Sequence, residues 1–140
     1  MSAERPPVVV DTSVWISWLI PTDVNNATAT NWLVGHSKAG GQIYAPSFLL
    51  AELAGAIRRA TGIESHALDL ANLLENFPPL TIVPMDAAMI DETVRVAARF
   101  ALTGASAIYV AMARLLSVPL VTFDREQLTR PVGYIITVRP

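Results

Sequence analysis

The stretch VVVDTSVWISWL, residues 8–19, decides the fold class of this 140-residue chain. Three valines form a strand-like apolar run, Asp11 follows at its end, and an apolar helical pattern begins directly afterwards. A carboxylate beside a buried core is costly unless hydrogen bonds or a cation offset its charge. Asp11 is therefore either the N-cap of the next helix or a ligand of a cation.

Four further β-rich runs follow along the chain, at residues 42–45, 80–84, 119–123 and 134–138. Helical patterns separate them, and strands that alternate with helices predict an α/β fold with a parallel sheet covered on both faces. In such sheets ligands bind at the carboxyl ends of the strands. Asp11 ends the first run and Asp124 ends the fourth, so both acids are expected at one edge of the sheet.

Helix boundaries are marked by Pro46, Gly62, the Pro78–Pro79 pair, Asp86 as an N-cap and Gly104. Apolar residues at helical spacing predict three buried stripes between these boundaries. Their members are Leu49, Leu50, Leu53 and Ile57; then Leu70, Leu73, Leu74 and Phe77; then Ile90, Val94, Ala97 and Ala101.

Composition narrows the possible functions. Without cysteine there is no disulfide, thiolate metal site or cysteine nucleophile, and two histidines argue against a histidine-rich zinc site. A net charge of −2 gives no broad basic field, so nucleic acid would need a local patch, formed mostly by arginine. No uncharged run reaches the roughly 20 residues of a membrane span, and the N-terminus around Glu4 and Arg5 has no apolar signal core. We therefore expect a cytoplasmic protein that does not contact a membrane.

Glu52 and Asp124 are two further acids that could belong to a site with Asp11. Glu52, in SFLLAELAG, lies on the flank of an apolar helical stripe among apolar neighbours, although an exposed helix glutamate is the commoner role. Asp124, in VTFDREQL, has an equally ordinary reading as the N-cap of a short helix.

Taken together, the motifs resemble the PIN domain family, and most of all the VapC-like ribonuclease toxins of prokaryotic toxin–antitoxin pairs. The resemblance rests on DTSVW at 11–15, the AE pair at 51–52 and GASAIYVAMARLLSVPLVTFD at 104–124, and it covers essentially the whole chain. It implies one domain over residues 1–140 with a three-layer α/β/α fold and a parallel sheet of about five strands. It also implies acids that bind Mg²⁺ or Mn²⁺, cleavage of single-stranded RNA, an antitoxin partner and a homodimer.

Position by position, Asp11, Glu52 and Asp124 match three of the family's acids. Our hypothesis is that they hold one Mg²⁺ or Mn²⁺ ion, which would polarise the phosphoryl oxygen and lower the pKa of bound water. The neighbouring residues Thr12, Ser13 and Thr122 are expected to orient these ligands. Arg125 either contacts RNA phosphate or is solvated surface.

Ser106 stands where the family usually has a fourth acid, just before AIYVA. Its hydroxyl can bind a metal-bound water or cap the helix, but it brings no negative charge. Two alternatives follow: a nuclease that works with three acids and one metal, or a degenerate PIN domain that binds RNA or a protein partner without cleaving.

Other classes with a doubly wound sheet fit less well. A phosphoacceptor receiver needs paired acids after the first strand, an Asp-x-Asp phosphatase needs an acid where Ser13 stands, and a nucleotide site needs a glycine-rich turn. A pure interaction role is the serious rival, because the apolar run around Trp15 and Trp18 exceeds what one helix must bury. Part of it packs in the core, and the remainder would suit a dimer face or an antitoxin helix.

Overall fold

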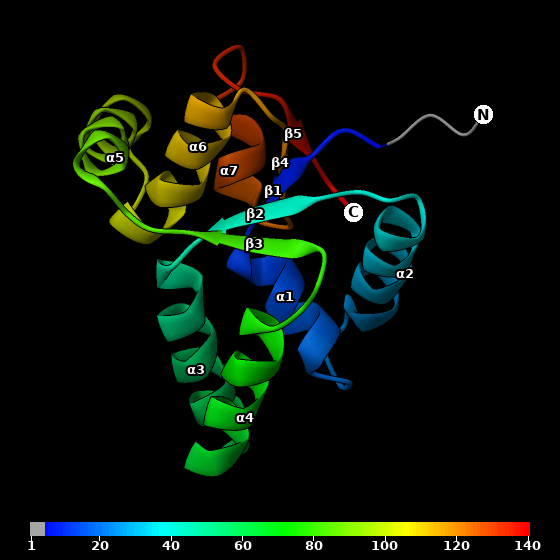
Figure 1. Cartoon of the computed structure of the whole chain (residues 1–140). Coiled ribbons are helices and arrows are strands. Elements are labelled where there is room, and N and C mark those ends of the chain that lie inside the picture. The colour runs from blue at the N-terminus through cyan, green and yellow to red at the C-terminus, as the bar shows by residue number, and fades with distance from the viewer. Residues whose placement is uncertain (1–4) are drawn as a thin grey trace.

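A five-stranded parallel sheet forms the centre of the molecule (Figure 1). This computed structural model describes residues 5–140, so Glu4 and the rest of residues 1–4 lie outside it. The spatial order is β3-β2-β1-β4-β5, with bounds Leu80–Val83, Ile43–Pro46, Val8–Val10, Leu120–Val121 and Thr137–Val138. Val9 pairs with Tyr44 on one side and with Leu120 on the other. The VVV run is thus the central strand, and Asp11 leaves the sheet at its middle.

Helices cover both faces of the sheet. They are α1 (Thr12–Leu19), α2 (Asn26–Lys38), α3 (Phe48–Thr61), α4 (Glu64–Glu75), α5 (Ala87–Phe100), α6 (Gly104–Leu116) and α7 (Arg125–Thr129). Figure 1 shows α1, α2, α3 and α4 below the sheet and α5 and α6 above it. The predicted three-layer α/β/α fold is confirmed.

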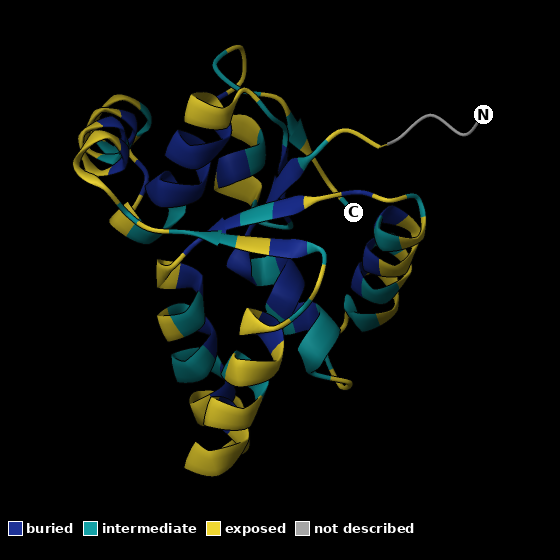
Figure 2. Ribbon diagram, in the orientation of Figure 1, coloured by how far each residue is buried: buried dark blue, intermediate teal, exposed yellow. Residues whose placement is uncertain are grey.

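The core consists of two apolar clusters separated by the sheet (Figure 2). Val8 and Val10 pack into the cluster formed with α1, α2, α3 and α4, whereas Val9 packs into the cluster formed with α5 and α6. This alternation is the period of two that a strand imposes on its side chains. Because β1 is covered on both faces, the residue that follows it is also taken out of water.

Packing around Trp15 fixes the turn from β1 into α1. Its ring is fully buried and its indole N–H donates to the carbonyl of Val10 at 3.3 Å. Trp18 and Phe77 pack against it at centroid distances of 6.0 Å. Trp18 is only partly buried, yet it also packs on the core. Most of the apolar run after Asp11 therefore belongs to the core.

Several predicted boundaries and faces were wrong. Strand β4 ends at Val121 and β5 begins at Thr137, so both are shorter than the runs 119–123 and 134–138. The chain turns earlier because Thr122 Oγ1 accepts from the Asp124 N–H, and because the Tyr134 N–H donates to the carbonyl of Pro131.

The buried face of α5 also differs from the predicted stripe. Ile90 and Val94 are 48% and 62% exposed, and Met89, Glu92 and Val96 are buried instead. Glu92 tolerates burial because Arg95 and Tyr134 both donate to its carboxylate. The buried face is thus displaced by about one residue from the predicted stripe, and its apolar members Met89 and Val96 pack into the cluster formed with α6. In α4, similarly, Leu73 is 47% exposed.

Within residues 5–140, no single helix is long and apolar enough to cross a membrane. Only α5 and α6 taken together reach that length and composition, and they meet at 114°.

Candidate active site

The predicted site residues meet at the carboxyl ends of the central strands. Asp11 follows β1, Asp124 follows β4, Glu52 lies on α3 directly beyond β2, and Ser106 lies in the first turn of α6. Elements separated by as many as 116 residues are brought into hydrogen-bond contact there. The edge predicted from the sequence is therefore the edge where these side chains gather.

Asp11 is buried, at 7% exposure, and both of its carboxylate oxygens accept hydrogen bonds. The Ser13 N–H donates to Oδ2 at 2.9 Å, and the Gln127 amide donates to Oδ1 at 3.0 Å. Burial raises the pKa of the Asp11 carboxyl, and the nearby charge of Asp124 adds to the rise, while the hydrogen bonds oppose it. Asp11 is thus the N-cap of α1. Two bonds leave acceptor capacity on a carboxylate, so the cap and the cation ligand are compatible roles.

Glu52 is half-buried on α3, and one of its oxygens carries two hydrogen bonds. Thr12 Oγ1 donates to Oε1 at 2.9 Å and the Tyr109 hydroxyl donates to the same oxygen at 2.7 Å. Burial is the main cause that raises the pKa of Glu52. Burial and the charge of Glu52 raise the pKa of Tyr109 far above its ordinary value, so the phenol stays protonated and donates. Glu52 is therefore a fixed inward-facing acid rather than an ordinary exposed helix glutamate.

Asp124 caps the short helix α7. Its Oδ1 accepts from the Gln127 N–H at 2.8 Å, and its own N–H donates to Thr122 Oγ1 at 2.9 Å. Its charge acts on Asp11, and the charge of Asp11 acts on Glu52. Asp11 is thus the acid that interacts electrostatically with both of the others.

The donor set suits a hard divalent cation, but the three acids do not close around one point. In the described part of the chain, no three Asp, Glu or His side chains lie together as a metal-binding group. Mg²⁺ is usually held by one or two carboxylates and keeps several waters. The side chains as they lie therefore fit a hydrated ion beside Asp11 better than an ion ligated directly by all three acids.

The predicted supporting residues each make a distinct contact. Thr12 donates to Glu52, and the backbone of Ser13 donates to Asp11. Thr122 does not touch a site carboxylate: its hydroxyl donates to the Gln127 carbonyl oxygen at 2.6 Å and accepts from the Asp124 backbone. Arg125 is exposed at the start of α7.

Ser106 is not the N-cap of α6, which corrects that alternative. Thr103 caps the helix, and its Oγ1 accepts from the Ser106 N–H at 3.2 Å. Thr103 and Ser106 both carry a hydroxyl that could cap α6, and the helix begins directly after Thr103.

Tyr109 and Gln127 are site residues that sequence reasoning missed. Both are fully buried polar side chains that contact the predicted acids. Tyr109 lies within the apolar stretch AIYVAMA, whose pattern predicts only that its ring is part of the core. Gln127 stands three residues after the N-cap Asp124, a position typical of a capping box, which would place it at the surface.

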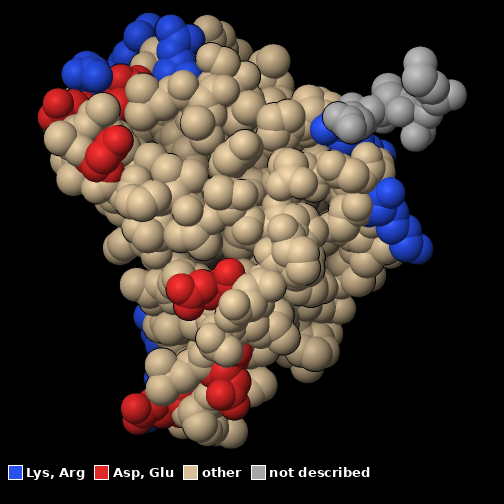
Figure 3. All heavy atoms as spheres, viewed as in Figure 1, with Lys and Arg blue, Asp and Glu red and all other residues tan. Residues whose placement is uncertain are grey.

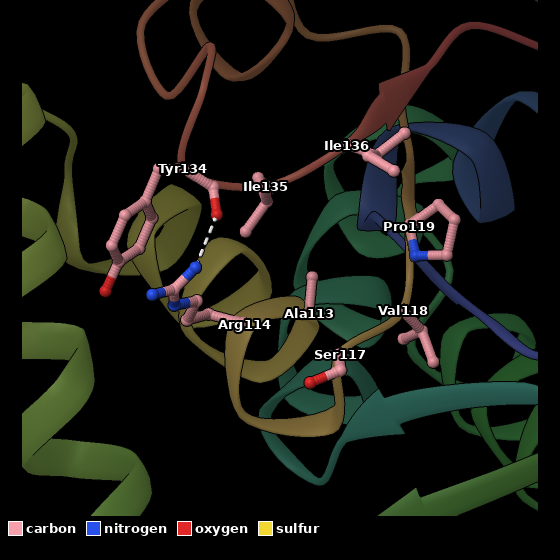
Figure 4. A pocket seen from close by; sticks show the side chains of 8 residues that line it. All are labelled: Ala113, Arg114, Ser117, Val118, Pro119, Tyr134, Ile135 and Ile136. Atoms are coloured by element: carbon pink, nitrogen blue, oxygen red, sulfur yellow. Dashed lines mark hydrogen bonds between the residues drawn. The ribbon is translucent and has the colours of Figure 1, made fainter.

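A recess elsewhere on the molecule is unrelated to these acids. It encloses about 250 Å³ between Ala113, Arg114, Pro119 and the Tyr134–Ile136 segment, at the amino ends of β4 and β5 (Figure 4). Arg114 donates to the Tyr134 carbonyl there at 3.0 Å. No acid lines it.

Charges on the face shown in Figure 3 form small separate groups, with no continuous basic surface. This scattered arrangement on one face agrees with the net charge of −2, which predicts no broad basic field.

The sequence matches the family model described as PIN domain over residues 8–131. The chain belongs to the PIN domain family. The matched range contains Asp11, Glu52, Ser106 and Asp124. No curated protein matches this PIN domain.

Solved structures with the same fold include toxins of toxin–antitoxin pairs. VapC20 of Mycobacterium tuberculosis, a sarcin–ricin loop cleaving toxin, superposes with a TM-score of 0.78 at 18% identity, over 95% of this chain and 99% of that one. VapBC2 of Rickettsia felis, bound to a DNA fragment from its promoter, gives 0.70 at 13% identity, over 96% and 98%. FitAcB of Neisseria gonorrhoeae gives 0.69 at 17% identity, over 93% and 95%. At these identities the likeness concerns the fold, which all three share along nearly their whole length.

Proposed function

We propose that this PIN domain is a metal-dependent endoribonuclease that hydrolyses single-stranded or loop RNA as the toxin of a toxin–antitoxin pair. The observation that carries the proposal is Asp11: a buried carboxylate at the end of the central strand, flanked by two further acids, in a chain of this family. VapC20, which superposes over nearly the whole chain, is a sarcin–ricin loop cleaving toxin.

In this proposal Asp11, Glu52 and Asp124 hold a hydrated Mg²⁺ or Mn²⁺ ion, directly or through its waters. When bound, such an ion polarises a phosphoryl oxygen and lowers the pKa of a water molecule. Thr12 and Tyr109 hold the Glu52 carboxylate toward the site. We assign Arg125 to a phosphate of the RNA and the Ser106 hydroxyl to a metal-bound water, and we place the enzyme in the cytoplasm.

An antitoxin partner and a homodimer are part of the same proposal. One solved structure of the same fold is a toxin–antitoxin complex from Klebsiella pneumoniae. Exposed Ile90 and Val94 offer apolar surface on α5 for a second copy. Light scattering on the purified chain tests the dimer, and a monomer at all concentrations would remove it from the proposal.

A non-cleaving, degenerate PIN domain is the second candidate. It is favoured by Ser106, which lacks the charge of the usual acid, and by acids that do not converge as a three-ligand group. The two candidates differ in what Ser106→Asp should do.

We expect the unaltered protein to cleave single-stranded RNA in Mg²⁺ or Mn²⁺, and Ser106→Asp to cleave it faster, because a fourth carboxylate strengthens cation binding. The measurement is the initial rate on a labelled single-stranded RNA, with EDTA as the metal-free control. Ser65→Asp, an exposed serine in the first turn of α4, controls for added charge. A silent unaltered protein with an active Ser106→Asp variant would establish the degenerate candidate, and silence from both would remove the nuclease proposal.

As the pH is lowered, metal affinity is expected to fall at a higher pH than it would for carboxyl groups with ordinary pKa values. Burial raises the pKa of Asp11 and Glu52 above their ordinary values of 3.8 and 4.5, and only the ionised form binds a cation. Mn²⁺ affinity should therefore fall as the pH is lowered through these raised values. Calorimetric titration between about pH 4 and about pH 8 measures it. An affinity that stays constant down to the ordinary carboxyl range would contradict the prediction.

The same raised pKa values determine the direction in which the stability of the metal-free protein changes with pH. At a pH between the pKa of the unfolded chain and the raised pKa of the folded protein, the folded state binds more protons. The contribution of Asp11 and Glu52 to stability is therefore fully present below the pKa values of the unfolded chain. That contribution is lost as the pH rises through the folded values. In the variant Glu52→Gln part of this pH dependence should disappear from the unfolding free energy.

A further inference from the structure

Gln127 is a fully buried amide with every polar atom engaged. Its Nε2 donates to Asp11 Oδ1 at 3.0 Å and to the Ser106 carbonyl at 3.1 Å. Its Oε1 accepts from Thr122 Oγ1 at 2.6 Å. The side chain thus joins the end of β1, the first turn of α6 and the residue after β4.

The orientation of this amide follows from its partners. The Ser106 carbonyl can only accept, and so can the ionised Asp11 carboxylate, so the atom between them must be the NH₂ nitrogen. The opposite atom faces Thr122 Oγ1, which already accepts from the Asp124 N–H and has its proton free to donate. The reversed amide would set a carbonyl oxygen against two acceptors inside the protein.

We propose that Gln127 is a positioning residue, which holds the Asp11 carboxylate in the orientation that binds the metal ion; this inference rests on the proposed nuclease function. Asp11 has two fixed donors, the Ser13 backbone and the Gln127 amide, one on each oxygen. The Ser13 bond to Oδ2 belongs to the cap of α1, so Gln127 is the contact that fixes the position of Oδ1. Partners of metal ligands commonly tune affinity in this way.

The location of Gln127 explains why a neutral amide suits the site. One of its N–H groups brings the positive end of a dipole to the buried Asp11 carboxylate without adding a charge that would repel a cation. Through the Ser106 carbonyl it also ties α6 to Asp11 at the turn where the family usually has a further acid. The side chain of Ser106 is not needed for this link.

The decisive variant is Gln127→Met, which keeps the length of the side chain and removes all three hydrogen bonds. We expect its affinity for Mn²⁺, measured by calorimetry well below the unfolding temperature, to fall roughly ten- to a hundredfold. Because the defect lies in metal affinity, excess Mn²⁺ should restore RNA cleavage by the variant. A merely structural role would lower the unfolding temperature and leave the affinity of the folded protein unchanged.

Gln42→Met is the matched control, since Gln42 is the one other glutamine of the chain and is exposed. Equal Mn²⁺ affinity of Gln127→Met and Gln42→Met would overturn the inference while leaving the nuclease proposal intact. Failure of the unaltered protein to bind Mn²⁺ would overturn both.

A metal-free measurement tests the hydrogen-bond arrangement separately. In NMR spectra the Gln127 side-chain amide protons should exchange slowly with solvent, and Asp11→Asn should shift their resonances and speed their exchange. Asp69→Asn, at an exposed position on α4, should change neither. Fast exchange in the unaltered protein would overturn the inference whatever the RNA assay shows.

Discussion

Asp11→Asn is expected to lower the rate of RNA cleavage by roughly a thousandfold, because metal polarisation of the phosphate contributes several kilocalories per mole to the transition state. Asp11 interacts electrostatically with both Asp124 and Glu52, so it is the acid through which the three charges are linked. Asparagine is as good an N-cap as aspartate, which keeps the start of α1 intact. The measurement is the initial rate at saturating RNA and metal.

A control variant separates charge loss at the site from charge loss elsewhere. Asp69→Asn removes an equal charge from the exposed face of α4 and should leave the rate unchanged. Thermal melts establish that both variants are folded at the assay temperature. Asp11→Asn activity within about tenfold of the unaltered protein, a difference of about 1.4 kcal/mol, would place the reaction at other residues.

The parts of the fold that could be predicted are those that depend on local pattern. VVV followed by Asp11 predicted a strand buried on both faces, because such a strand reads as a continuous apolar run; its central place in the sheet was not predicted. The alternation of such runs with helices then predicted the parallel sheet and the edge where Asp11 and Asp124 lie. Both follow from properties that neighbours in the chain determine.

The buried face of α5 and the existence of α2 depend on tertiary partners instead. Helical periodicity alone does not distinguish Ile90 and Val94 from Met89 and Val96, which pack into the apolar cluster formed with α6. Helix α2 buries only Ala29, Leu33 and His36, in a segment with a weak apolar pattern. The spacing of apolar residues within α5 or α2 does not predict which face is buried or that α2 forms.

The candidate site divides in the same way. The acids could be predicted because a carboxylate at the end of an apolar strand calls for compensation. The compensation that the structure supplies, from Tyr109 to Glu52 and from Gln127 to Asp11, spans 57 and 116 residues of sequence. A buried tyrosine in an apolar helix and a glutamine in a short helix both have commoner roles, so these contacts become visible only when the chain is folded.

Trp15→Ala is expected to lower the free energy of unfolding by about 3–5 kcal/mol, the range for removing a large aromatic side chain from a core. Trp15 is fully buried, contacts Trp18 and Phe77, and donates to the carbonyl of Val10. Domains of this size are stable by only about 5–15 kcal/mol, so the loss is a large share of the total. Urea unfolding measures it, with the slope m expected to stay constant.

Trp18→Ala is the matched control, because the same side chain is removed from a partly buried position on the same helix. Its cost should be clearly smaller. A loss below about 1 kcal/mol for Trp15→Ala, the size of an ordinary substitution, would contradict the packing described for α1. Trp15 donates to the carbonyl of Val10, the residue directly before Asp11. Removing the Trp15 side chain should therefore lower the stability of the protein and, as a consequence, its affinity for the metal ion. Asp11→Asn should instead remove activity from a protein that stays folded, and this difference separates the packing that positions the site from the charge that performs its chemistry.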